Sequence, residues 1–327
     1  MSEKVIEWLL EEENPSIRFF TLTSLLGKSE DDPTVKSAKK AIMEKGIVPK
    51  ILDMQNADGS WGSPERFYTD KYEGAVWTLL ILAEMAADPE DQRIKNACEF
   101  ILGHSRDPES GGFSHAQSVK TQSGLTSGVI PCLTGNMVYS LIKLGCFNDE
   151  RVQKGIEWIC RYQRADDGEE GFPVGKIYER YKTCWGRHSC HMGVAKTLKA
   201  LAAIPESERN NEVSNKLSQL FEYFLKHHIY KKSHNLEEVS KPGWLKFGFP
   251  LMYQTDVLEM LGIFADLKIR DPRLEDAIGI VKGKKNEDGL WMMENSNNGK
   301  MIVSVEKKGK PSKWITLKAL KVLREYR

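Results

Sequence analysis

Two cysteines, two histidines and an arginine lie within eight positions in the segment CWGRHSCH, residues 184 to 191. An apolar helical pattern follows directly, which places Cys184 in a turn and puts His188 and His191 on one helix face. Thiolate sulfur and imidazole nitrogen are ligands that zinc accepts, and Asp256 or Cys132 from a neighbouring helix would complete the set. The pattern predicts a zinc site formed by Cys184, His188, His191 and Asp256. The alternative is that the cysteines are small buried hydrophobic side chains and the histidines hold the loop by hydrogen bonds.

Cationic and aromatic residues lie near the starts of other apolar segments. The stretch from 241 to 261 is rich in aromatic residues, glycine and proline, and such a loop either plugs a cavity or lines an apolar pocket. Arg187 and Lys313 would hold an anionic group, and Asp256 or His191 would act as the catalytic acid or base. The aromatic residues expected to shape the cavity are Tyr72, Trp244, Tyr253 and Trp314. This combination suits an apolar anion, such as an isoprenoid diphosphate.

These side chains must be positioned by a repeating arrangement of helices. Six apolar segments begin at residues 17, 72, 134, 188, 253 and 312, which is a nearly regular spacing. Amphipathic patterns alternate with them, and a helix that is apolar on all sides must be buried. Repeats of this length indicate stacked helical pairs. The sequence predicts an all-α fold in which about six helical hairpins close into an α/α toroid, with the apolar helices as the inner ring.

The predicted toroid spans residues 1–327 as a single domain, with residues 1–45 alternatively forming a HEAT-like helical extension. In a toroid the inner helices direct the same end toward one mouth of the central cavity. Residues at their N-termini are therefore expected to converge there, although they are far apart in sequence. Helix N-termini also offer free N–H groups and a partial positive charge, which favours an anionic ligand.

Composition limits the classes of partner. Of the 327 residues 40% are hydrophobic, and 47 Lys plus Arg face 46 Asp plus Glu, for a net charge of +1. This balance lacks the broad positive field that binding of bulk nucleic acid requires. No apolar run is long enough to form a transmembrane segment, and the six cysteines follow no tight framework pattern. We therefore expect a cytoplasmic protein with free thiols.

The loops between the helical pairs share a motif. The segment QNADGSWG matches the pattern QxxxGxW at Gln55, Gly59 and Trp61, and three further loops are degenerate copies: HSRDPESGGFS from 104, QRADDGEEGFP from 163 and KNEDGLWMME from 285. On these motifs, residues 10 to 327 resemble the terpenoid cyclase and protein prenyltransferase β-subunit superfamily. The α/α toroids of that superfamily carry such QW repeats. The resemblance implies an isoprenoid-like substrate in the central cavity.

The prenyltransferase branch also implies a zinc ion at the N-termini of inner helices, held by a D-x-C pair and a later histidine. In this chain Leu258 stands where the cysteine of that pair would follow Asp256. A zinc site would therefore need a rearranged set that uses Asp256, Cys184 and His191. The DxDD segment of class II cyclases does not occur in the sequence. Whether a second subunit is needed, as in the prenyltransferases, stays open.

Three functions are consistent with the sequence. The first is a protein similar to a prenyltransferase or terpene cyclase that binds or transforms an apolar anionic small molecule. The second is a non-catalytic scaffold or interaction protein whose ring is filled by its own side chains. The third is a carbohydrate-active enzyme, because α/α toroids also host lyases and hydrolases that use pairs of carboxylates. Its candidate acids and bases are Asp70, Glu73, Asp256 and Glu294.

Overall fold

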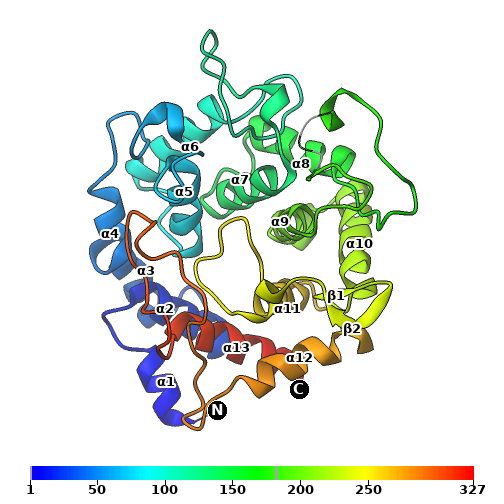
Figure 1. Cartoon of the computed structure of the whole chain (residues 1–327). Coiled ribbons are helices and arrows are strands. Elements are labelled where there is room, and N and C mark those ends of the chain that lie inside the picture. Colours follow the sequence, from blue (N-terminus) through cyan, green and yellow to red (C-terminus); the bar gives the residue numbers. More distant parts are fainter. Residues whose placement is uncertain (1, 180, 182) are drawn as a thin grey trace.

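The computed structural model describes residues 2–179, 181 and 183–327, and its helices form an inner and an outer ring (Figure 1). The inner ring comprises α2 (Pro15–Phe20) with its π-helical continuation η1 (Thr21–Leu25), α5 (Ala75–Glu84), α7 (Pro131–Lys143), α9 (His191–Ala202), α11 (Val257–Asp266) and α13 (Lys313–Glu325). The outer ring comprises α3 (Pro33–Glu44), α4 (Ile47–Leu52), α6 (Gln92–His104), α8 (Glu150–Tyr162), α10 (Asn211–Lys226) and α12 (Glu275–Gly283). The predicted all-α toroid is confirmed.

Shorter elements connect the two rings. The N-terminal helix α1 (Glu3–Leu9) packs against α13. An antiparallel pair of short strands, β1 (Lys231–Lys232) and β2 (Asn235–Val239), follows α10. Single helical turns complete the described elements: η2 (Pro64–Arg66), η3 (Thr126–Gly128), η4 (Lys176–Tyr178), η5 (Glu206–Glu208), η6 (Pro242–Leu245) and η7 (Pro272–Leu274).

Contacts between successive inner helices close the ring. From α5 to α13 each inner helix contacts the next one along the chain, and α13 returns to contact α2 and η1. Ser16 Oγ donates a hydrogen bond of 2.7 Å to Met85 O, which joins α2 to the end of α5. Arg324 donates one of 2.7 Å to Leu25 O, which joins α13 to η1. The first and last inner elements therefore meet.

The two rings differ in burial as the sequence pattern indicates. All ten residues of α5 are buried, whereas the outer helix α8 buries one face and exposes the other. The outer helices α6, α8 and α10 are preceded by the N-cap residues Asp91, Asp149 and Asn210, and each of these side chains accepts a backbone N–H of the first turn. Such caps satisfy donors that the helix itself leaves unpaired.

The QW-type loop from Gln55 to Trp61 joins two outer helices, α4 and α6. Gln55 Nε2 donates to Gly59 O within the loop at 3.1 Å and to Arg93 O at the start of α6 at 2.9 Å. The buried Trp61 donates its indole N–H to Ile51 O in α4 at 2.8 Å. At Gly59 φ is +89°, and a Cβ atom would lie 2.4 Å from Asn96 O. Only glycine fits this position, so these motif residues serve the fold.

The loop that precedes α11 reaches into the ring (Figure 1). Trp244, Phe247, Phe249 and Met252 are each at most 1% exposed. Asn136 of α7 holds the loop by donating to Met252 O at 3.0 Å. Of the two roles predicted for residues 241 to 261, the structure shows the plug: apolar side chains fill the interior on the side of the inner-helix N-termini.

Among the described residues, no helix combines the length and the apolar character that crossing a bilayer requires.

Candidate functional site

His191 begins α9, but its surroundings are not those of a metal ligand. Its Nδ1 lies 3.2 Å from the hydroxyl of Tyr223, and its ring packs edge-on against His227, with centroids 4.7 Å apart. Burial, reinforced by the neighbouring His227, lowers the pKa of His191 from 6.5 to about 4. The imidazole is therefore neutral near pH 7 and packs within an aromatic cluster that includes Trp244.

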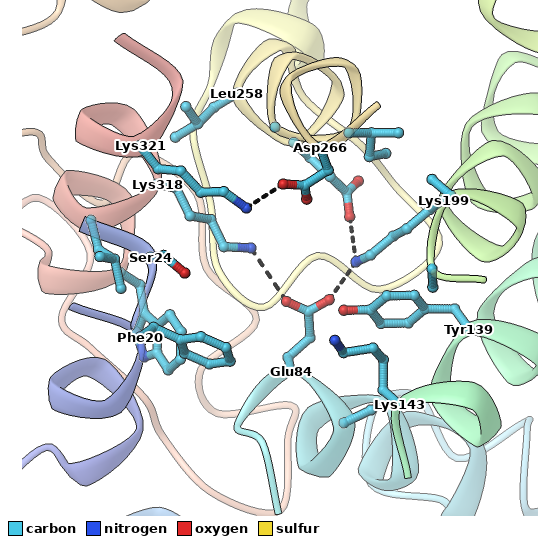
Figure 2. Close-up of a pocket in the computed structure, with 18 residues that line it drawn as sticks. Phe20, Ser24, Glu84, Tyr139, Lys143, Lys199, Leu258, Asp266, Lys318 and Lys321 are labelled. Carbon is cyan, nitrogen blue, oxygen red and sulfur yellow. Dashed lines mark hydrogen bonds and ion pairs between the residues drawn. The ribbon is translucent and has the colours of Figure 1, made fainter. Parts of the chain in front are cut away.

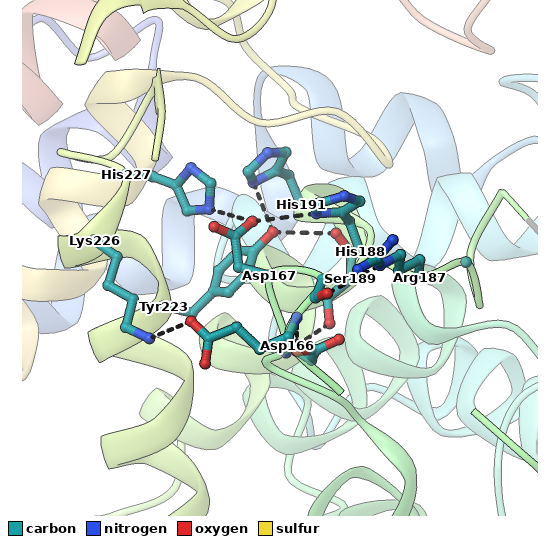
Figure 3. A network of polar contacts seen from close by, with 12 residues as sticks. Asp166, Asp167, Arg187, His188, Ser189, His191, Tyr223, Lys226 and His227 are labelled. Carbon is teal, nitrogen blue, oxygen red and sulfur yellow. Dashed lines mark hydrogen bonds and ion pairs between the residues drawn. The ribbon is translucent and has the colours of Figure 1, made fainter. Parts of the chain in front are cut away.

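His188 belongs to a different contact, centred on Asp167 (Figure 3). His188 Nδ1 is 3.5 Å from Asp167 Oδ1, and His227 Nε2 is 3.2 Å from the same oxygen. The His227 contact is electrostatic, because its direction does not meet hydrogen-bond geometry. Burial alone would raise the pKa of Asp167, but a hydrogen bond from Ser233 and the charge of His227 together hold it below the usual value. These contacts fix the loop between α8 and α9 against the end of α10.

Asp256 is the N-cap of α11 and is 1% exposed. Its Oδ1 accepts the Glu259 N–H at 2.8 Å and its Oδ2 accepts the Gly248 N–H at 3.0 Å. Burial, with the nearby charge of Glu259, raises the pKa of Asp256 from 3.8 to about 7. Both oxygens thus hold the plug loop to the helix.

The predicted zinc ligands are therefore not assembled. Cys184 is half-buried, and burial raises the pKa of its thiol to about 11, which opposes the thiolate form that binds metal. Within residues 2–179, 181 and 183–327, no three His, Cys, Asp or Glu side chains are placed to hold a metal ion. Cys184, His188, His191 and Asp256 instead contact separate partners, and this corrects the ligand set inferred from their spacing.

The two predicted anion-binding cations also lie apart. Arg187 is exposed, and its Nε donates to Gly168 O at 3.0 Å. Lys313 is ion-paired with Glu11, and its ammonium group lies 5.3 Å from the ring centroid of Trp8. Each cation is thus used to fix a neighbouring segment. They do not form a common clamp.

The four predicted aromatic residues fall into three clusters. Tyr72 and Tyr253 do meet, with ring centroids 6.3 Å apart. Trp244 packs against His191 and Phe224, with centroid distances of 6.1 and 6.0 Å. Trp314 stacks on Phe249 at 4.1 Å. Two pairs of predicted site residues therefore meet beside helix N-termini: Tyr72 with Tyr253, and Trp244 with His191 at the start of α9.

The structure instead places a pocket beside the C-terminal halves of α5, α7 and α9, and α11 and α13 also line it. Its cavity volume is about 450 Å³, and it is drawn in Figure 2. One wall is apolar and comes from α2, α11 and α13, with Phe20, Leu258, Ile263, Trp314 and Leu317. The charged or polar lining comes from α5, α7 and α9, with Glu84, Tyr139, Lys143 and Lys199, and also from α11 and α13, with Glu259, Asp266, Lys318 and Lys321.

A chain of ion pairs forms the floor of this pocket. Glu84 accepts from Lys199 and, at 3.3 Å, from Lys318. Glu259 accepts from Lys199 at 2.8 Å and from the fully buried Lys196 at 2.7 Å. Burial alone would raise the pKa of Glu259, but the two lysines overcome it and bring the pKa to about 2. Lys199 and Lys318 hold the pKa of Glu84 below its ordinary value against the effect of burial. Both carboxylates are ionised at neutral pH.

The rim of the pocket adds more positive than negative charge. Lys321 pairs with Asp266 at 2.5 Å. Lys143 is exposed and forms no ion pair within the described part of the chain, and Figure 2 shows it beside Tyr139 and Glu84. The lining holds four ammonium groups and three carboxylates, which leaves an excess of one positive charge: Lys143, Lys199, Lys318 and Lys321 against Glu84, Glu259 and Asp266. An anion is the complementary ligand.

Comparisons with known proteins give similarity in structure at low sequence identity. No model of a protein family matches the chain, and no curated protein sequence matches it either. The type II terpene cyclase MstE from Scytonema, in complex with its substrate geranylgeranyl dihydroxybenzoate, is 13% identical; the match covers 95% of this chain and 85% of that chain at a TM-score of 0.43. A family 76 glycoside hydrolase from a bovine Bacteroides thetaiotaomicron strain is 11% identical and is matched over 96% and 68% at a TM-score of 0.44. A protein from Actinoplanes is 13% identical and is matched over 88% and 99% at a TM-score of 0.33.

The sequence does carry a signal for the pocket residues, although it differs from the motifs at the helix starts. Glu84, Lys196, Lys199 and Glu259 each lie in an inner segment that is otherwise apolar. An ionisable side chain in a helix that is buried all round needs a partner of opposite charge, because an isolated buried charge is strongly unfavourable. The number of such charges on different inner helices indicates an internal ion-pair network. Glu84 and Lys199 lie in the C-terminal halves of α5 and α9, which indicates the end of these two helices at which the network forms.

Proposed function

We propose that this protein binds an apolar anionic small molecule in the pocket beside the C-terminal halves of α5, α7 and α9. The observation that carries the proposal is the excess of lysine over carboxylate charge in a pocket that also has a large apolar lining. The cavity volume of about 450 Å³ lies within the range of roughly 300 to 1,000 Å³ that is usual for small-molecule sites. The sequence pattern predicts this ligand beside the N-termini of the inner helices, so the proposal keeps the ligand class and moves the site.

The charged lining residues would hold the anionic group of the ligand, and the apolar lining residues would hold its apolar part. The anionic group would lie near Lys143 and Lys318, because both line the open part of the pocket. The apolar part would lie against Phe20 and Leu317, where its burial removes hydrocarbon surface from water. Glu84 and Glu259 are ionised and paired, so they orient lysines and do not act as proton donors. An isoprenoid diphosphate has both required parts.

The proposal is tested with geranyl diphosphate by isothermal titration calorimetry. We expect inorganic diphosphate, which lacks the apolar part, and geraniol, which lacks the anion, each to bind at least about tenfold more weakly. We expect Lys143→Met and Lys318→Met each to weaken geranyl diphosphate binding by about tenfold, since each removes one charge from the head-group region.

Lys154→Met is the matched control, because Lys154 is an exposed lysine on the outer helix α8 that pairs with Glu157. The Lys154→Met variant should bind geranyl diphosphate with the affinity of the wild type. Binding that survives both pocket substitutions unchanged would contradict the proposed site. The absence of binding for all three probes would favour the scaffold function instead.

Three of the four carboxylates named for a carbohydrate-active enzyme, Asp70, Asp256 and Glu294, are engaged in other contacts. Asp70 lies 3.3 Å from Arg66, and both oxygens of Asp256 accept backbone N–H groups. Glu294 accepts the Phe247 N–H and pairs with Lys284. No specific observation favours sugar chemistry at these residues.

A further inference from the structure

Lys71 lies over three aromatic rings at the N-terminal end of the inner ring, and neither Lys71 nor these rings line the anion pocket. Its Nζ is 4.9 Å from the ring centroid of Tyr253, 5.3 Å from that of Tyr68 and 6.0 Å from that of Trp77. All three distances are within the roughly 6 Å at which an ammonium group is attracted to an aromatic face. The rings come from the segment before α5, from α5 itself and from the segment before α11.

The three rings form a cage that is fixed from behind. The centroids of Tyr68 and Trp77 are 5.0 Å apart, and those of Trp77 and Tyr253 are 6.3 Å apart. Trp77 is 1% exposed, and its indole N–H donates to Tyr68 O at 2.9 Å. Tyr72, which is 7% exposed, packs edge-on against Trp77 at 5.1 Å. The faces presented to the cation are therefore held before it arrives.

The open side of the cage faces solvent. Lys71 is exposed, whereas Tyr68 and Tyr253 are half-buried. The neighbouring carboxylate of Asp70 lies against Arg66, at 3.3 Å, and Lys71 forms no ion pair within the part of the chain that the structure describes. The ammonium group is thus held by ring faces and not by a carboxylate. A cation from solution would meet the same faces if Lys71 moved aside.

We propose that Tyr68, Trp77 and Tyr253 form a binding site for an organic ammonium cation of the trimethylammonium class, and that Lys71 is its tethered competitor. A primary ammonium is strongly hydrated, whereas a trimethylammonium group is weakly hydrated and fills an aromatic cage more completely. Displacement of Lys71 by such a cation gains ring contact and returns the lysine to water. This site is independent of the function proposed for the anion pocket.

The test compares choline with its neutral isostere 3,3-dimethylbutan-1-ol by isothermal titration calorimetry. Removal of the tethered competitor in Lys71→Ala should tighten choline binding by about tenfold or more, because a tethered group competes at an effective concentration in the millimolar range. In this variant choline should bind at least about tenfold more tightly than the isostere, since only the charged ligand gains cation–π attraction.

Two substitutions of Tyr253 distinguish the contribution of its aromatic face to choline binding from that of its apolar size. In the Lys71→Ala background, Tyr253→Phe should keep choline binding, whereas Tyr253→Leu should weaken it by about tenfold. The indole N–H resonance of Trp77 should shift on titration and gives a readout inside the cage. Lys120→Ala, at another exposed lysine, should bind choline as the wild type does.

Equal choline affinities for the wild type and Lys71→Ala would overturn the role of Lys71. Equal affinities of choline and the isostere would overturn the cation site and leave an apolar patch. A Tyr253→Leu variant that keeps full affinity for choline, and whose far-ultraviolet circular dichroism equals that of the wild type, would also overturn the cation site.

Discussion

At the residue scale, Asp256 shows how a buried carboxyl group serves the architecture. Its two oxygens accept N–H groups from the plug loop and from the first turn of α11, at 3.0 and 2.8 Å. These bonds favour the carboxylate, yet burial dominates and raises the pKa to about 7. The folded protein therefore holds a proton at Asp256 under conditions in which the unfolded chain has lost it.

This shift predicts a pH dependence of stability. The folded-state pKa of Asp256 lies above its unfolded value of 3.8, so the folded state binds more protons between about pH 4 and pH 7. The contribution of Asp256 to the free energy of unfolding is largest below this window and decreases as the pH rises through it. Three pKa units correspond to a decrease of about 4 kcal/mol.

The measurement is urea denaturation at a series of pH values. The Asp256→Asn variant has no titrating group at this position. The difference in unfolding free energy between the two proteins should therefore shift in favour of Asn as the pH rises from 4 to 8. A difference that is independent of pH would show that Asp256 is ionised in the folded state across this range.

At the element scale, the inner helices approach one another through small residues. Gly135 of α7 faces the backbone of α9, and a Cβ atom there would lie 2.4 Å from Lys196 C. The same contact places α9 so that Lys196 and Lys199 reach Glu259. Close packing of two helices thus sets the position of the ion-pair network at the pocket floor.

We expect Gly135→Ala to destabilise the protein by about 2 kcal/mol or more, because two backbones would have to separate. Alanine has the higher helix propensity, by about 1 kcal/mol, but this gain is smaller than the steric cost. Gly279→Ala in α12 is the matched control, since a Cβ atom at Gly279 would meet nothing within 4 Å. That variant should be as stable as the wild type or more stable by up to about 1 kcal/mol. Thermal unfolding of both variants decides this, and equal effects would contradict the close-packing argument.

At the scale of the whole molecule, the ring depends on contacts between the two ends of the chain. Lys313 at the start of α13 pairs with Glu11 and lies over Trp8, and Arg324 donates to Leu25 O. These contacts join the last inner helix to the first helices. Lys313 therefore contributes to closure of the ring, and it is not among the residues that line the pocket.

A double-mutant cycle of Glu11→Gln and Lys313→Met tests this role. We expect a coupling energy of about 1 kcal/mol in urea denaturation, limited by solvent screening because the Glu11 side chain is 50% exposed. Geranyl diphosphate affinity should stay within about threefold of the wild type, since Lys313 is not part of the pocket. A large loss of affinity without a change in stability would return Lys313 to the ligand site that its position in the sequence suggested.

Local sequence pattern is enough to predict the ring of helices, but it predicts little of the site. Six apolar segments at nearly equal spacing indicate an inner ring because a helix with no polar face must be buried. The same pattern correctly predicts that Tyr72 and Tyr253 lie together at the N-terminal end of the inner ring. It also puts Arg187 and Lys313 near helix starts, but it could not show that Gly168 and Glu11 would be their partners.

Which end of the ring is open depends instead on tertiary packing. The aromatic loop before α11 could have lined a cavity, but folding it inward buries Trp244, Phe247 and Phe249 and closes that end. The pocket then lies where Glu84, Lys199 and Lys318 meet from three different helices. These charges are distant in sequence and are paired because burial of each alone would be too unfavourable. Pairing of this kind depends on distances between helices, which no local pattern contains.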